Sequence, residues 1–152
     1  MFEKEMLAYK SLSSLQGNII PTLYGDYHIE HRQREYIRDR IVYIALFEFI
    51  DGIPLSPRII SSLTDDEANS LWAVIQSSMS SIHEIGVVRR NRLLQKLLWK
   101  KESSRVTWID FSQSALVADM SVDDAIAGKD SDLAILFNRF EEAMNASVPQ
   151  RM

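Results

Sequence analysis

Apolar residues recur at helical spacing near the start of the chain and again in its middle. The first pattern predicts an amphipathic helix over residues 2–15, which Gly17 would end. The second begins at Thr64, whose hydroxyl can accept a backbone hydrogen bond while Glu67 reaches back to it, an arrangement called a capping box. Gly86 would end this second helix, after one apolar stripe that consists of Ala68, Leu71, Trp72, Ile75, Met79 and Ile82.

Three runs of apolar residues predict strands instead. Residues 41–49 are rich in branched and aromatic side chains, which indicates a buried strand after a polar, charge-mixed stretch. Residues 94–99 and 105–109 are shorter, and the polar loop 100–104 between them favours a hairpin. A small strand-containing part therefore precedes a hairpin that lies late in the chain.

Turn residues separate these strands from the helical remainder. The pair Asp51-Gly52, followed by two prolines, predicts a turn and a linker after the 41–49 strand. A last helix is expected to begin at a cap formed by Asp130 or Ser131. Its apolar positions are Leu133, Leu136, Phe137, Phe140 and Met144.

Composition agrees with one ordinary domain. The chain has 152 residues, of which 46% are hydrophobic and 25% charged, enough to build a core without help. It has no cysteine, which excludes disulfides and thiolate metal sites. The first residues are charged, and no apolar run approaches the ~20 residues of a membrane span. We therefore expect a cytoplasmic protein with neither a secretory signal nor a membrane segment.

The net charge of −4 conceals two oppositely charged segments. Residues 89–105 contain seven Lys or Arg against one acid, whereas residues 110–142 contain eight acids against two bases. The basic segment could attract phosphates, nucleic acid or an acidic partner, or the two segments could neutralise each other across the fold. Neutralisation is favoured, and nucleic acid is not expected, because the basic segment lacks the interleaved aromatic residues of nucleic-acid platforms.

The order of these elements, together with several short motifs, resembles a protein kinase. The matching segments are Glu5-Met-Leu-Ala-Tyr9, residues 15–25, Leu46-Phe-Glu-Phe-Ile-Asp-Gly52, Ile82-His-Glu-Ile-Gly-Val87 and Val106-Thr-Trp-Ile-Asp-Phe-Ser112. They look like helix C, its following loop, the hinge, the end of helix E and the magnesium-binding motif of fungal-type protein-kinase-like proteins. The resemblance implies an α+β, protein-kinase-like fold in one truncated domain. Residues 1–50 would form a reduced N-lobe and hinge, and residues 51–152 a mostly helical, partial C-lobe.

The resemblance also implies which residues would act, and several of them are changed. Glu5 matches the helix C glutamate, although the glycine-rich loop and the strand that carries the phosphate-binding lysine have no match in the chain. The hinge positions that would contact a nucleotide are Glu48, Phe49 and Ile50. Asp110 matches the magnesium ligand, with Ser112 where the family usually has glycine.

The catalytic loop departs most from the family. Arg89 stands where the resemblance places a histidine, Asn91 where it places the catalytic aspartate, and Lys96 where it places a metal-binding asparagine. A neutral amide cannot take a hydroxyl proton at neutral pH, and an ammonium repels a metal ion. The resemblance therefore implies a degenerate, pseudokinase-like domain.

We accordingly expect a non-catalytic domain that binds another protein or retains no activity. ATP and magnesium are at most weak ligands, and no cofactor is expected. One alternative is an active phosphotransferase completed by a longer chain or a partner, and another is phosphate or nucleic-acid binding through residues 89–105. Without further strands, apolar surface around 41–49 would be uncovered, which suggests a homodimer or pairing with another chain.

Overall fold

The computed structural model describes residues 1–31 and 40–146, and its first part is a helix packed on a two-stranded sheet. Helix α1 (Phe2–Ser11) and the 3-10 turn η1 (Ser13–Leu15) precede strands β1 (Leu23–His31) and β2 (Arg40–Phe47), which pair antiparallel. Aromatic contacts fix α1 on one face of the sheet. Phe2 lies 5.0 Å from Tyr43, and Tyr9 lies 4.6 Å from Phe47, between ring centroids.

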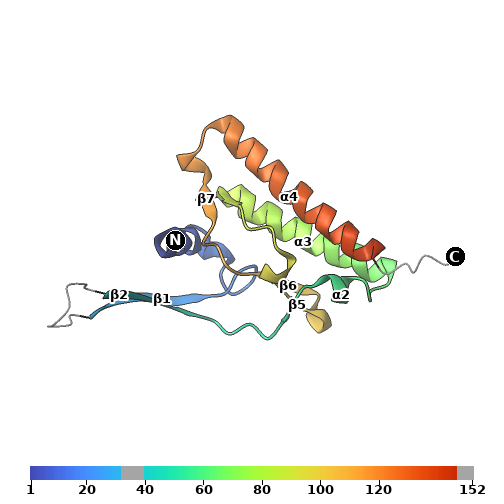
Figure 1. Cartoon of the computed structure of the whole chain (residues 1–152), viewed down its shortest axis with the longest axis horizontal. Helices are drawn as coiled ribbons and strands as arrows, with labels where there is room; N and C mark the ends of the chain where they lie inside the picture. Colours follow the sequence, from blue (N-terminus) through green and yellow to red (C-terminus); the bar gives the residue numbers. More distant parts are fainter. Residues whose placement is uncertain (32–39, 147–152) are drawn as a thin grey trace.

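The second part is built on two long helices that lie side by side, while the β1–β2 hairpin projects away from them (Figure 1). Between and around these helices run short strands that form one three-stranded and one two-stranded sheet. The elements in chain order are β3 (Ile53–Pro54), α2 (Pro57–Ile60), α3 (Asp65–Ile85), β4 (Val87–Arg89), η2 (Leu94–Lys96), β5 (Leu97–Lys100), η3 (Lys101–Ser103), β6 (Arg105–Trp108), β7 (Ser114–Leu116), η4 (Val117–Asp119) and α4 (Val122–Asn145).

The middle helix forms as its local signals predict. The hydroxyl of Thr64 accepts from the backbone N–H of Glu67 at 3.3 Å, and the Glu67 carboxylate accepts from the N–H of Thr64 at 3.0 Å. Gly86 ends α3 with a φ of 95°, a left-handed conformation that glycine adopts without steric cost. The hairpin predicted around the 100–104 loop is also confirmed, because β5 and β6 pair antiparallel across it.

One hydrophobic core joins the two parts. Its buried members include Tyr9 of α1, Ile75 of α3, Trp108 of β6 and Phe140 of α4. Trp108 links them further, since its backbone N–H donates to the carbonyl of Ile19 at 2.8 Å and its indole N–H donates to the hydroxyl of Ser78 at 2.7 Å.

Several predicted boundaries in the first part are wrong. The helix expected over 2–15 ends at Ser11 and is followed by a 3-10 turn, because Leu12, with a φ of −87° and a ψ of 21°, leaves the α-helical conformation. Strand β1 was not predicted, because the stretch that leads into residues 41–49 was interpreted only as polar and charge-mixed. The 41–49 strand exists but is not buried, because α1 covers one face of the sheet and leaves the other open.

Two further boundaries differ in the second part. The last helix begins at Val122, and its cap is Ser121 rather than Asp130 or Ser131. The early turns of α4 escape prediction because Val122 and Ile126 are exposed and produce no apolar stripe. The strand expected over 94–99 starts as the 3-10 turn η2 and becomes β5 at Leu97.

Within the described residues, no helix combines the length and apolar character that crossing a membrane requires.

Candidate functional site

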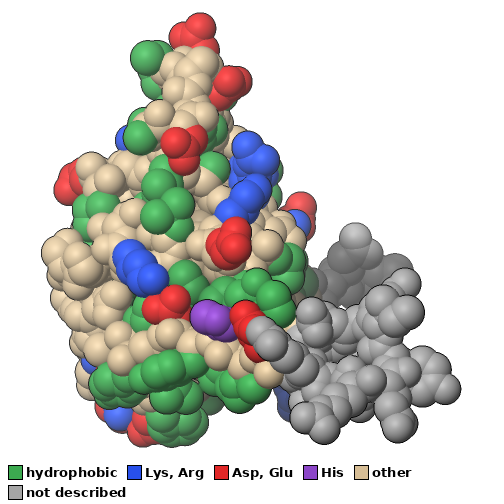
Figure 2. Space-filling view, turned by 90° about the vertical axis from the view of Figure 1, so that its left-hand side faces the viewer, with side chains coloured by type: hydrophobic (Ala, Val, Ile, Leu, Met, Phe, Trp, Pro, Cys, Tyr) green, Lys and Arg blue, Asp and Glu red, His purple; other side chains and the backbone are tan. Residues whose placement is uncertain are grey.

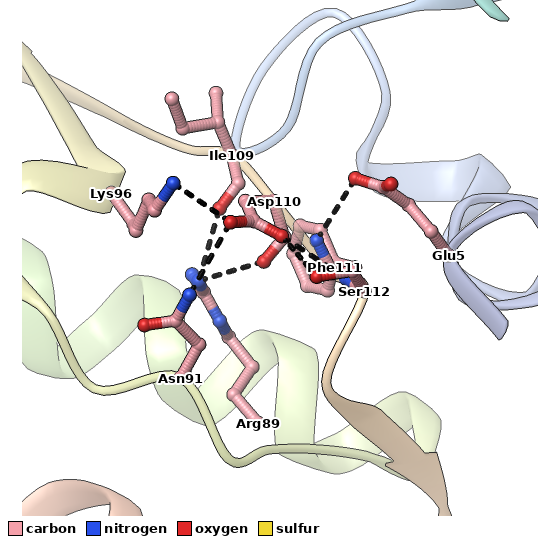
Figure 3. A network of polar contacts seen from close by, with 8 residues as sticks. All are labelled: Glu5, Arg89, Asn91, Lys96, Ile109, Asp110, Phe111 and Ser112. Carbon is pink, nitrogen blue, oxygen red and sulfur yellow. Dashed lines mark hydrogen bonds and ion pairs between the residues drawn. The ribbon is translucent and has the colours of Figure 1, made fainter. Parts of the chain in front are cut away.

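The antiparallel pairing of β4 with β7 brings two loops together. This pairing sets Arg89 opposite Ser114. The loop that follows β4 therefore lies beside residues 110–112, which connect β6 to β7. Figure 3 shows the result, with Arg89, Asn91 and Lys96 on one side of the Asp110-Phe111-Ser112 segment and Glu5 of α1 on the other.

The Asp110 carboxylate is surrounded by donors from this chain. One oxygen accepts from Lys96 Nζ at 2.8 Å and from Asn91 Nδ2 at 3.3 Å. The other accepts from the hydroxyl of Ser112 at 2.5 Å and from its backbone N–H at 3.3 Å. Burial alone would raise the pKa of Asp110, but the hydrogen bonds from Lys96 and Ser112 outweigh it and hold this pKa below its usual value. Asp110 is therefore an ionised group that is neutralised internally.

The backbone at Asp110 is unusual. Its φ of 62° lies in the left-handed region, which residues other than glycine adopt infrequently and which costs roughly 1–2 kcal/mol. Aspartate tolerates this region better than most residues, because its side chain can bond locally, as it does here with Ser112. The surrounding contacts thus hold the segment in a conformation that it would not favour alone.

Arg89 supplies much of that constraint. Its side chain is buried, and its Nη2 donates to the carbonyls of Ile109 at 3.0 Å and Asp110 at 3.2 Å. The guanidinium carbon lies 4.7 Å from the ring centroids of both Trp108 and Phe111. Burial lowers the pKa of Arg89 to about 10, with Asp132 opposing the shift. Its Nε and Nη1 make no hydrogen bond within the described part of the chain.

Asp132 is a fully buried acid that sequence reasoning missed. Its exposed fraction is 0%, and it accepts from the backbone N–H of Arg89 at 2.7 Å and from Arg92 Nε at 2.8 Å. His83 Nε2 lies 3.2 Å from the same carboxylate, so this histidine of α3 contacts an acid of α4. The position of Asp132 in the helical pattern could have identified it as a buried residue. Asp132 lies four residues before Leu136 and eight before Phe140, on the buried face of α4.

Glu5 reaches the same segment from α1. Its carboxylate accepts from the backbone N–H of Phe111 at 3.2 Å. Burial raises the pKa of Glu5, the Phe111 hydrogen bond opposes the shift, and the charge of Asp110 adds to it. The position matched to the helix C glutamate therefore contacts the Asp-Phe-Ser segment and is more than an exposed helical acid.

Within residues 1–31 and 40–146, the three hinge positions make no hydrogen bond or ion pair with Asp110 or the residues around it. The Glu48 carboxylate accepts from the backbone N–H of Thr22 at 3.0 Å and from its hydroxyl at 2.9 Å. Phe49 points into solvent with 88% of its surface exposed, and the carbonyl of Ile50 accepts from the N–H of Gly52 at 3.0 Å. A nucleotide role for these three residues stays a prediction.

Most cations of the 89–105 segment are already engaged. Apart from Arg89, Arg92 and Lys96, Lys100 pairs with Asp51 at 3.1 Å and Lys101 pairs with Glu67 at 2.8 Å. Arg105 donates to the carbonyls of Gly17 at 2.8 Å and Asn18 at 3.0 Å. Six of the seven thus contact an acceptor within the described residues. Two of these bases, Arg92 and Lys96, pair with acids of the 110–142 segment.

The residues around Asp110 do not fit a magnesium ion. Magnesium prefers oxygen ligands in near-octahedral geometry. Here an ammonium lies 2.8 Å from the carboxylate, and Asn91 presents its amide nitrogen to it rather than its oxygen. A metal ion near Asp110 would face the positive charge of Lys96 at close range.

The order and contacts of the elements define a protein-kinase-like arrangement. It consists of a helix that bears Glu5, a hairpin, a linker and a helical part that contains the Asp-Phe-Ser segment. Comparison with solved structures agrees. The chain is similar to WaaP in complex with acyl carrier protein, with a TM-score of 0.62 and 16% identity, over 97% of this chain and 67% of that one. The chain therefore has an α+β, protein-kinase-like fold.

A sequence relative points in the same direction. Over 69 residues the chain is 32% identical to a protein described as probable serine/threonine-protein kinase fnkB of Dictyostelium discoideum. The match covers 44% of this chain and 13% of that protein. No model of a known protein family matches the chain.

Replacing Arg89 tests its structural role. We expect Arg89→Met to lower the free energy of unfolding by about 2 kcal/mol, because methionine fills similar space but loses the bonds to the two carbonyls. Urea unfolding of both proteins measures the difference. The matched control is Arg90→Met, an exposed neighbour that should change stability by less than about 0.5 kcal/mol. Equal effects of the two substitutions would contradict the role assigned to Arg89.

The Asp110–Lys96 pair predicts a pH dependence. Because the pKa of Asp110 is lowered by folding, the pair contributes stability above the unfolded pKa of about 3.9, and this contribution is lost as pH falls through the folded pKa. We expect Lys96→Met to cost about 1 kcal/mol at pH 7 and progressively less in acid. Urea unfolding from pH 7 to strong acid measures the gap, and a gap that stays constant over this range would contradict the prediction.

Proposed function

We propose that this chain is a non-catalytic, pseudokinase-like domain. The observation that carries the proposal is the internal neutralisation of Asp110 by Lys96 at 2.8 Å. In this arrangement the carboxylate that a kinase-like fold would offer to a metal is already paired with a cation of the same chain. Asn91 adds a second donor to the same oxygen.

The lack of a base at the catalytic position supports the same conclusion. Positioning and charge neutralisation account for most of phosphoryl transfer, while a general base contributes roughly a hundred- to ten-thousandfold. Asn91 cannot accept a hydroxyl proton at neutral pH, and its amide is used to hold Asp110. Another group would therefore have to act as the general base, and another group would have to hold the metal ion that neutralises charge.

A domain of this kind would act by binding another protein. We take residues 1–50 as its reduced N-lobe and hinge and residues 51–152 as its partial C-lobe. The similar solved structure is titled as a complex of WaaP with acyl carrier protein, which supports a protein partner for this fold.

An active phosphotransferase is the second candidate. The hydrogen bond from Phe111 to Glu5 favours it, because it links α1 to the Asp-Phe-Ser segment, and so does the kinase relative. If the chain binds ATP with magnesium, a concentration a hundred times the dissociation constant would add about 2.7 kcal/mol to the folded state. Binding of nucleic acid through residues 89–105 is less well supported, because most of those cations are engaged.

A matched pair of variants tests the proposal. Lys96→Asn removes the cation beside Asp110, so we expect Mn²⁺ to bind this variant at least about tenfold more tightly than the unmodified protein, a gain of about 1.4 kcal/mol. Paramagnetic broadening of NMR signals near Asp110 would report the binding. Lys101→Asn, which breaks a comparable ion pair with Glu67, should leave Mn²⁺ binding unchanged.

Phosphate transfer completes this test. Incubated with labelled ATP, Mg²⁺ or Mn²⁺ and a generic protein acceptor, the protein should transfer no more phosphate than its Asp110→Ala variant. Transfer that depends on Asp110 would overturn the proposal and favour the active enzyme.

A further inference from the structure

The β1–β2 hairpin has two chemically different faces. The face toward α1 is identified by the Lys10–Asp26 ion pair at 3.2 Å and by the ring contacts of Tyr43 and Phe47. Since side chains alternate along a strand, the strand register places the intervening residues on the opposite side. The name outer face is used here for Tyr27, Ile29, Val42, Ile44 and Leu46 on this opposite side, and the same register places the pair His31 and Arg40 beyond them at the end of the strands.

The sequence of β1 places apolar residues on the outer face and polar residues on the face toward α1. From Tyr27 to Glu30 the residues alternate strictly, with tyrosine and isoleucine on the outer face and histidine and glutamate on the face toward α1. Such alternation is typical of a strand that has one side in contact with a core. Here the apolar side is the one that points away from the core of its own domain.

The outer face is exposed in the described chain. Tyr27, Ile29, Val42 and Leu46 each have 50–56% of their surface exposed, and Ile44 is half-buried between them. No charged side chain lies among these five positions. Figure 2 views the molecule from the hairpin side, where hydrophobic side chains gather on the lower part of the surface.

Gly25 makes room for this face. A Cβ atom built on Gly25 would lie 2.8 Å from the Tyr27 hydroxyl oxygen and 3.0 Å from two ring carbons. The Tyr27 ring therefore lies back along its own strand over the glycine. The ring therefore extends the apolar surface over Gly25 and leaves room for a second sheet to pack against this face.

We propose that the outer face docks the same face of a second copy of this chain, forming a two-layer sheet sandwich. A charged partner would leave its own charges without counterions against five uncharged positions, whereas a second copy presents an equally uncharged surface. A contact of this kind is isologous and closes as a two-fold dimer. The inference is independent of whether the domain binds nucleotide.

The area available sets the strength of the contact. Only one of the five side chains is aromatic, and even a fully buried aromatic side chain contributes about 150–250 Å², so five partly exposed side chains offer at most on the order of 400 Å² per copy. A standard interface buries about 800 Å² per partner. The dimer is therefore weak, and its population rises with protein concentration.

Two equally exposed isoleucines provide a matched test. Ile29 lies on the outer face with 54% exposure, and Ile126 lies on α4 with 56%. In sedimentation equilibrium over a wide range of concentrations, we expect the unmodified protein to follow a monomer–dimer equilibrium. Ile29→Glu should weaken association at least about tenfold, because it buries a charge, and Ile126→Glu should not change it. A protein that stays monomeric, or equal effects of the two variants, would overturn the proposal.

A cross-linking measurement keeps the test decisive if a glutamate variant fails to fold. The chain has no cysteine, so one introduced thiol can link only to a second copy. Stacked sheets lie about 10 Å apart, which is too far for a disulfide but within reach of a short bis-maleimide. Ile44→Cys should cross-link efficiently and Ile126→Cys should not. If Ile44→Cys links no better than Ile126→Cys, the dimer uses another surface and the proposal fails.

Discussion

A single buried arginine connects the elements on which the candidate site depends. Arg89 bonds through its backbone to Asp132 of α4, through its side chain to the carbonyls after β6, and by ring contacts to Trp108 and Phe111. Burying a guanidinium is costly unless dipoles and counter-charges surround it. Because Asp132 and two carbonyls supply them, β4, the Asp-Phe-Ser segment and α4 can adopt only positions that keep those contacts.

The pairing of acids with bases of the same chain also explains the chemistry of the site. In this chain Lys96 brings a positive charge to Asp110, and Arg92 brings another to Asp132. The acids of the site therefore bind bases of the same chain, which stabilises the fold.

Local signals were readable from the sequence, and long-range ones were not. Thr64, Glu67 and Gly86 act within one turn of α3, so their pattern predicted both of its ends. The start of α4 escaped because Val122 and Ile126 face solvent, and β1 escaped because its core-side positions are polar. The motif order predicted the kinase-like fold. Asp132 was missed because its partners lie about 40 residues or more away, although its spacing from Leu136 and Phe140 placed it on the apolar face of α4.

The contacts of Glu48 have a mechanical consequence. Its carboxylate and its backbone N–H both bond to Thr22, the latter at 2.8 Å, so the end of β2 is tied to the start of β1 on three bonds. Trp108 ties the same region to the helical part through Ile19. A segment fastened on both sides resists bending as a pivot between the two parts. A surface held in this way loses little conformational entropy when it associates with another molecule.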